Sequence, residues 1–281
     1  MSTDVGAAPA EPRSAAPASA PPLLHLHNIS KSFGAVHALV DIDLEIPAGQ
    51  VTALAGDNGA GKSVLIKCIA GIHTPDSGEI LWEGRPVHLR TPRESAALGI
   101  ETVHQDLALC DNLDIAQNMF LGREKTHRFV LAEDAMEKAA GETLQSLAVT
   151  TVRSVRQLVA SLSGGQRQAA AIAKAVLWNS KLVIMDEPTA ALGVAQTAMV
   201  LNLVRSLADR GLAVMIVSHN MNDVFEVADR VAVLRLGQLV AQKPASEMDA
   251  QIVVDIMTTG VSTRAVGQKP AKPARTADDQ G

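Results

Sequence analysis

A glycine-rich octapeptide leaves this chain few folds to choose from. It fits the pattern G-x-x-x-x-G-K-[ST] with Gly56, Asp57, Asn58, Gly59, Ala60, Gly61, Lys62 and Ser63. In such a loop several backbone N–H groups point at a phosphate, the lysine adds a cation, and the serine hydroxyl can ligate Mg²⁺. The pattern has this meaning only between a strand and a helix, so the flanking sequence decides the interpretation.

The segments on either side of the loop match this requirement for a strand and a helix. Residues 51–55 form a short apolar run that ends at the loop, and residues 62–70 predict a helix that begins there. A helix N-terminus favours an anion, because its first N–H groups lack partners and its dipole is positive at that end. We therefore interpret the loop as a nucleotide-phosphate site rather than as an ordinary glycine-rich turn.

The rest of the chain predicts an α/β domain. Apolar runs at 182–185, 213–217 and 231–234 alternate with helical segments, which is typical of a mainly parallel sheet covered on both faces. Residues 24–29 alternate like an edge strand, and residues 42–46 alternate in the same way. The stretch 107–176 predicts helices, most clearly at 132–147, and we assign it to a helical lobe inserted between core strands.

Composition narrows the class of protein. The 281 residues are 47% hydrophobic and only 2% aromatic, with a formal net charge of −5, so neither a basic face nor a base-stacking platform for nucleic acid is expected. No apolar run is long enough to span a membrane, and two cysteines, Cys68 and Cys110, favour neither a disulfide framework nor a zinc site. We expect a protein without a secretory signal, in a reducing cytoplasm, that is soluble or membrane-associated through partners.

The two ends of the chain differ from the middle. Residues 1–22 are mostly Ala, Pro and Ser, and residues 263–281 are rich in Lys, Pro, Arg and Asp without apolar periodicity. Such composition predicts disordered tails. The expected organisation is thus one domain over 23–262 between two tails.

Two acids follow an apolar strand, at residues 186 and 187. Ligands in open α/β sheets bind beyond the carboxyl ends of the strands, where these side chains lie. Asp186 is placed to hold Mg²⁺, and Glu187 to polarise an attacking water. Alone, such a pair is more often a solvated strand end; together with the phosphate loop, the catalytic interpretation is favoured.

Further motifs resemble those of the ABC ATPases. Residues 162–166 read Leu-Ser-Gly-Gly-Gln, like the signature of that family, and they precede the strand that ends in the two acids. His219 resembles the switch histidine, Gln105 the glutamine of a conserved loop, and Phe33 the aromatic that stacks on adenine. The pieces stand in the family's order over about residues 24–260. The resemblance implies a P-loop NTPase with a mainly parallel core sheet, an antiparallel β subdomain and a helical subdomain at about 107–177.

The same resemblance implies roles and a cofactor pair, ATP and Mg²⁺. Glu187, His219 and Gln105 would be catalytic, and Ser63, Gln105 and Asp186 would ligate the metal ion. Two copies would pair head to tail, so that each ATP lies between one phosphate loop and the other copy's signature residues. The nucleotide contacts would come from Phe33, the phosphate loop through Val64, and Ser163, Gly164, Gly165 and Gln166. Each has a plainer alternative: a core phenylalanine, a structural histidine, a loop amide or a helix N-cap.

Three segments narrow the resemblance to bacterial monosaccharide importers, above all the fructose type: residues 56–63, 118–124 and 187–193. This implies a homodimer on the cytoplasmic face of the inner membrane, with permease subunits and, indirectly, a periplasmic sugar-binding protein. Fructose, xylose and ribose stay open as the sugar. Two residues depart from the usual ABC pattern: Val64 replaces a hydroxyl residue, and Gly193 replaces an aspartate that couples the subunits.

Three other classes of protein compete with this interpretation. An ABC protein that acts on DNA or ribosomes usually carries a second cassette, zinc modules or long coiled coils, which the sequence lacks. A P-loop kinase or GTPase leaves the signature segment unexplained. A regulator that binds ATP without hydrolysing it does not need Glu187 and His219.

Overall fold

A computed structural model describes residues 21–261 of the chain. The predicted tail at 263–281, and all but the last two residues of the tail at 1–22, lie outside the described residues. Within the described part, no helix is both long and apolar enough to cross a membrane.

The core of the described part is a six-stranded sheet in the order β12-β11-β3-β10-β9-β6. All neighbours pair in parallel except β12, which runs antiparallel to β11. The strands are β3 (Val51–Ala55), β6 (Ile100–Val103), β9 (Leu182–Asp186), β10 (Ala213–Val217), β11 (Arg230–Arg235) and β12 (Gln238–Pro244). The predicted mainly parallel sheet is confirmed.

This sheet is buried on both faces, which explains why its central strands are apolar at nearly every position, with Thr52 in β3 and Asp186 at the end of β9 as exceptions. In β9, Val183 and Met185 join one core cluster, while Leu182 and Ile184 join the other. Successive side chains of a strand point to opposite faces, so an unbroken apolar run needs a layer on each side. The first cluster lies under the helices from α3 onward, and the second lies under α1 (Lys62–Ile69) and a second sheet.

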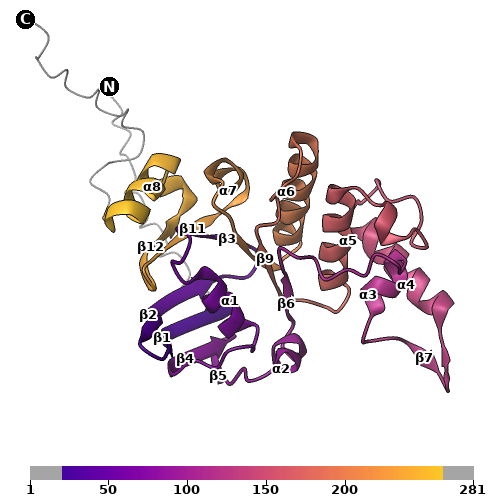
Figure 1. The fold of residues 1–281 in the computed structure, drawn as a ribbon, viewed down its shortest axis with the longest axis horizontal. Helices are drawn as coiled ribbons and strands as arrows, with labels where there is room; N and C mark the ends of the chain where they lie inside the picture. Colours follow the sequence, from indigo (N-terminus) through magenta and orange to yellow (C-terminus); the bar gives the residue numbers. More distant parts are fainter. Residues whose placement is uncertain (1–20, 262–281) are drawn as a thin grey trace, which may run out of the picture.

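The second sheet of the described residues is antiparallel, in the order β2-β1-β4-β5 (Figure 1). Its strands are β1 (Leu24–Phe33), β2 (Val36–Ile46), β4 (Ser77–Trp82) and β5 (Arg85–Val87). The edge position predicted for residues 24–29 is wrong, because β1 pairs with β2 on one side and β4 on the other. Alternation shows that one face is buried; it cannot show how many neighbours a strand has.

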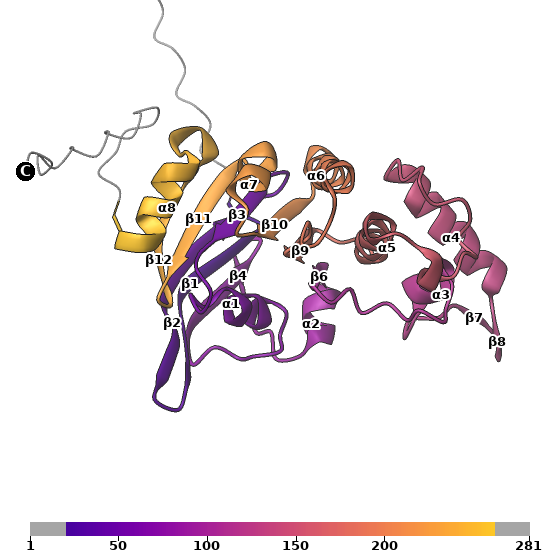
Figure 2. The ribbon, with the colours of Figure 1, turned by 45° about the horizontal axis from the view of Figure 1, so that its top comes forward.

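The helical lobe lies at the end of the molecule opposite α8 (Ala250–Thr259), as Figures 1 and 2 both show. It contains α3 (Ile115–Phe120) and α4 (Glu133–Ser146), and α5 (Gly164–Val176) contacts these two as well as α6 (Val194–Asp209) of the core. The remaining helices are α2 (Pro92–Ala97) and α7 (Met221–Val227), with 3-10 turns at Val159–Ser161 and Ala245–Glu247.

One element of the lobe escaped prediction. A small hairpin, β7 (Thr126–His127) and β8 (Val130–Leu131), projects between α3 and α4. Both strands are exposed, and Phe129 at the turn is fully exposed. Two-residue strands in solvent carry too little periodicity to be recognised from sequence.

Candidate functional site

Four parallel strands bring the predicted site residues to one edge of the core sheet. The phosphate loop follows β3, Gln105 follows β6, Glu187 follows β9 and His219 follows β10. A cavity of about 570 Å³ opens at this edge. Its lining includes nine predicted residues, namely Asn58, Gly59, Gly61, Lys62, Ser63, Val64, Gln105, Asp186 and Glu187.

The glycines of the loop are required by its shape. Gly61 has φ +107°, and a Cβ built there would lie 2.7 Å from the carbonyl oxygen of Ala38. A Cβ on Gly56 would lie 2.5 Å from the carbonyl oxygen of Leu234. Both distances are far below van der Waals contact, so the backbone passes where no side chain fits.

The lysine of the loop is held by the loop itself. Lys62 Nζ donates to the carbonyl oxygens of Gly56 at 2.6 Å and of Asp57 at 2.9 Å. Gly61 caps α1 without a side-chain hydrogen bond, so no side chain satisfies the first N–H groups of the helix. A cation and unpaired donors therefore face the same cavity, which is the arrangement that binds phosphate.

The acids at the end of β9 lie in different environments. Glu187 Oε1 is 2.8 Å from Nδ1 of His219, and the Glu187 N–H donates to the carbonyl oxygen of Val217 on β10. Glu187 adopts φ +51°, a left-handed conformation that is costly outside glycine and is concentrated at functional sites. Burial and then the charge of Glu187 raise the pKa of Asp186, although His104 and Lys62 lower it in part.

A partly buried hydrogen-bond network around Asp223 joins the segments that carry these groups. Thr189 Oγ1 donates to one carboxylate oxygen of Asp223 at 2.5 Å, and Asn220 Nδ2 donates to the other at 2.9 Å. The loop after Glu187 and the start of α7 after His219 are thereby joined. The sequence analysis missed Asp223, which no motif identifies; its position on the buried face of a short helix is the only signal.

Oxygen ligands suitable for Mg²⁺ line the same cavity. Ser63, Gln105 and Asp186 offer hydroxyl, amide and carboxylate oxygens, the hard donors that this ion prefers. Burial and then repulsion by Glu187 raise the pKa of Asp186, and a divalent cation would offset both. The donor set thus fits the ion.

The signature residues lie outside this cavity. Ser163 is the N-cap of α5 in a complete capping box: its Oγ accepts from the Gln166 N–H, and Gln166 Oε1 accepts from the Ser163 N–H. Gln166 Nε2 also donates to the carbonyl oxygen of Thr151 at 2.6 Å. A Cβ on Gly165 would lie 3.1 Å from Gln196 and Met199, because α5 packs tightly on α6.

Phe33 also lies outside the cavity. Its ring is 45% exposed at the end of β1, and it packs edge-on against His73 at 5.2 Å with Lys31 Nζ 5.6 Å from its centre. One wall of the cavity comes from residues that no motif identifies, at the start of β2 and in the β11–β12 turn: Val36, His37, Ala38, Leu236 and Gly237. β2 and this turn meet through a hydrogen bond from the Val40 N–H to the Gly237 carbonyl oxygen, across a separation that no local motif reveals.

Val64 and Gly193, the two residues that depart from the usual pattern of the ABC ATPases, lie in different surroundings. Val64 lines the cavity and packs against the core under α1. Gly193 is the N-cap of α6, with φ −73° and no atom within 4 Å of an added Cβ. The glycine is therefore not required by the backbone at this position.

Comparison with known proteins agrees with this geometry. The profile of the ABC transporter family matches residues 39–190. The chain is 45% identical over 237 residues to the xylose/arabinose import ATP-binding protein XylG of Sulfolobus acidocaldarius, covering 84% of this chain and 94% of the relative. It is 48% identical to the fructose import ATP-binding protein FrcA of Rhizobium meliloti, covering 77% and 86%. It is 39% identical to the ribose import ATP-binding protein RbsA 2 of Escherichia coli O157:H7, spanning 84% of this chain but only 46% of that longer protein.

Solved structures of ATP-binding cassettes also resemble this chain. A nucleotide-free ATP-binding cassette from an ABC transporter superposes with a TM-score of 0.72 at 26% identity, covering 79% of this chain and 91% of the other. The ADP conformation of another cassette gives 0.72 at 25% identity, covering 84% and 95%. A dimeric cassette in a post-hydrolysis state with ADP and Pi gives 0.66 at 25% identity, covering 79% and 98%.

Proposed function

Since this chain belongs to the ABC transporter family, we propose that it is the ATP-hydrolysing subunit of an importer for a monosaccharide. Relatives that match most of its length are named for xylose/arabinose and fructose import, so a pentose or fructose is the proposed cargo. The observation that carries the proposal is the hydrogen bond between His219 and Glu187, since Glu187 lines the same cavity as Lys62.

The proposed chemistry follows from the residues around the cavity. The α1 N-terminus and Lys62 bind the phosphates of ATP. Glu187 polarises the attacking water, and His219 holds the Glu187 carboxylate in place through Nδ1. Mg²⁺, held by Ser63, Asp186 and Gln105, would supply charge neutralisation at the phosphates. The contact of Phe33 with adenine stays a prediction, because Phe33 lies outside the cavity.

The pocket is proposed to be completed by a second copy. Ser163, Gly164, Gly165 and Gln166 lie at the α5 N-terminus, away from the cavity of their own chain, so they serve the phosphate of a partner in a two-fold dimer. Loss of the γ-phosphate removes charge that attracts both helix ends, and the dimer opens. Permease subunits, with a periplasmic sugar-binding protein beyond them, place this dimer at the cytoplasmic face of the inner membrane.

The substitution Glu187→Gln tests the proposal. It keeps the size and one hydrogen-bonding oxygen of the side chain but removes the base, so we expect kcat to fall by about 1,000-fold while ATP binding persists. The variant should accumulate as a closed dimer with ATP, measurable by light scattering. The exposed Glu226→Gln is the matched control. Hydrolysis by the Glu187 variant at the native rate would refute the proposed base.

A further inference from the structure

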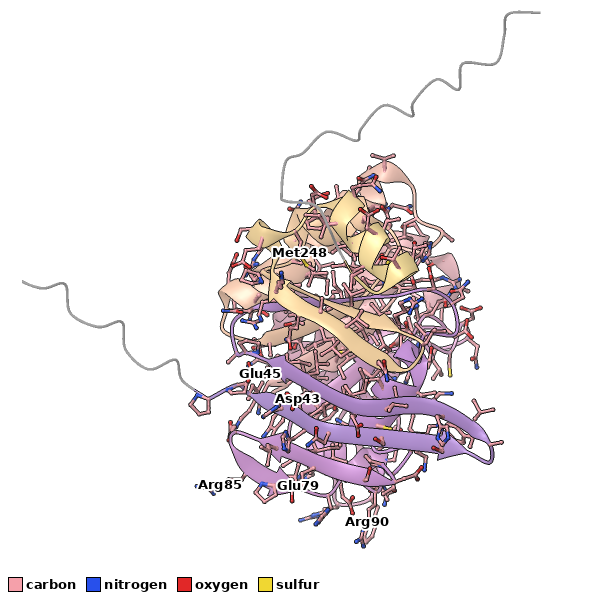
Figure 3. All side chains as sticks on the ribbon, turned by 90° about the vertical axis from the view of Figure 1, so that its left-hand side faces the viewer. Asp43, Glu45, Glu79, Arg85, Arg90 and Met248 are labelled. Atoms are coloured by element: carbon pink, nitrogen blue, oxygen red, sulfur yellow. The ribbon has the colours of Figure 1, made fainter. Side chains whose placement is uncertain are left out.

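A second cluster of chemistry-bearing side chains lies on the outer face of the antiparallel sheet. His25 and His27 on β1 and Asp43 on β2 each offer a ligand atom, and these atoms all lie within 4.8 Å of one another. No motif discussed above includes them, and none of them lines the nucleotide cavity. Figure 3 faces this sheet and labels Asp43 on β2 together with Glu45 and Glu79.

The strand pairing explains why the three groups meet. Leu24 and Leu26 of β1 are buried, so His25 and His27 at the alternate positions face outward. The register pairs Leu26 with Leu44, which places Asp43 beside the two histidines on the same face. The ligand atoms are therefore held by two hydrogen-bonded strands rather than by a loop, and such a scaffold keeps a site in shape.

The Asp43 carboxylate contacts both histidine rings. Asp43 Oδ1 lies 2.9 Å from Nε2 of His25, and Oδ2 lies 2.9 Å from Nδ1 of His27. The contacts show two imidazoles and one carboxylate converging on a common point.

We propose that His25, His27 and Asp43 bind a divalent transition-metal ion, of which Zn²⁺ is the representative. Two imidazole nitrogens and one carboxylate oxygen are a ligand set that suits this ion, with bonds of about 2.0–2.2 Å. Zinc takes the place of the hydrogen bonds between the rings and the carboxylate, and small rotations of the three side chains bring the three ligand atoms to these distances. Water completes the coordination.

Neighbouring side chains favour a cation at this place. Glu45 is the cross-strand partner of His25, and Glu79 is the cross-strand partner of His27. Their negative charge adds to that of Asp43 on the same face. Asn28 Nδ2 lies 3.3 Å from His27 Nε2, the nitrogen left free when Nδ1 holds the metal, so a turn of this amide lets its oxygen accept the Nε2 proton.

Zinc titration of the full-length, untagged, chelator-treated protein without nucleotide tests the proposal. We expect one Zn²⁺ per chain by calorimetry and by metal analysis after dialysis, and a rise in Tm of about 5 °C at saturating zinc. Co²⁺ in place of Zn²⁺ should give the visible absorption of a tetrahedral nitrogen and oxygen site. Absence of saturable zinc binding overturns the proposal.

Substitutions test whether zinc binds at these three residues. The double substitution His25→Gln and His27→Gln should remove the bound zinc and the Tm rise, and Asp43→Asn should do the same if the double variant folds poorly. His88→Gln, at another exposed histidine of the same sheet region, is the matched control and should bind zinc as the native chain does. Unchanged zinc binding in the double variant, or equal loss in the control, overturns the assignment. ATP turnover with Mg²⁺ should be unaffected in all of them, which keeps this test independent of the proposed transport function.

Discussion

Two helices of this molecule begin with glycine-rich sequence, yet their N-termini are built differently. α1 begins at Gly61, in a left-handed conformation with no side-chain cap, whereas α5 begins at Ser163 in a reciprocal capping box with Gln166. The first helix leaves its donors unpaired and depends on an anion to satisfy them. In the second helix, the capping box satisfies the N–H groups of Ser163 and Gln166 and leaves the N–H groups of Gly164 and Gly165 without a side-chain acceptor. In the proposed dimer, we therefore expect the phosphate to bind first at α1, and α5 of the second copy to contact it afterwards.

The largest effect on this difference between the two helix ends is expected when the cation at α1 is removed. Lys62→Ala removes the ammonium that the loop holds, and we expect ATP affinity to fall by about 100-fold, with turnover lost at cellular nucleotide levels. Fluorescent-nucleotide binding measures it. Lys67→Ala, on the exposed side of the same helix, is the matched control and should bind normally. Native affinity in the Lys62 variant would contradict the role of α1.

The next test acts on the metal end of the same pocket. Asp186→Asn replaces the acid with a neutral amide of equal size, and we expect kcat to fall by about 100-fold because the metal ion is held less well. Burial raises the pKa of Asp186, so the neutral side chain should not lower the Tm of the nucleotide-free protein. A Mg²⁺ titration of hydrolysis checks the cause: the variant should need more Mg²⁺. An unchanged Mg²⁺ dependence would exclude Asp186 as a ligand.

Mixing two inactive variants sharpens the comparison between the helices. Ser163→Asp keeps an N-cap residue at α5 but sets a carboxylate against the partner's phosphate, and Lys62→Ala disables α1. Each alone should be inactive. In a mixed dimer, the intact α1 of one copy meets the intact α5 of the other at one of the two pockets. About half of the dimers in an equal mixture are mixed, so the mixture should recover about a quarter of the native rate. Failure of every mixture to hydrolyse ATP would show that the pocket is not shared between copies.

The smallest effect is expected at Val64. Val64→Thr keeps the branched shape and offers a hydroxyl to the α-phosphate, which should tighten ATP binding by about 3-fold. The apparent affinity should change while kcat does not. Weaker binding would indicate that the core contact of Val64 under α1 outweighs the new hydrogen bond.

The sequence predicted what depends on local pattern. The strand at Val51–Ala55 and the helix that starts at Lys62 were predicted at these positions, because the loop glycines and the apolar run determine them. The acids at 186 and 187 were predicted at a strand end for the same reason. The pairing of β1 on both sides and the wall formed by Ala38 and Gly237 were not, because both depend on segments far apart in the chain.

The glycine at the start of α6 has an evolutionary consequence. Nothing lies within 4 Å of an added Cβ at Gly193, and its dihedral angles suit any residue, so an aspartate would fit there and would stabilise the helix by only about a few tenths of a kcal/mol relative to glycine. Two of the four glycine codons become aspartate codons through one nucleotide change. With either of those two codons, the exchange needs one step, and folding stability opposes it in neither direction because the two residues differ so little as helix caps.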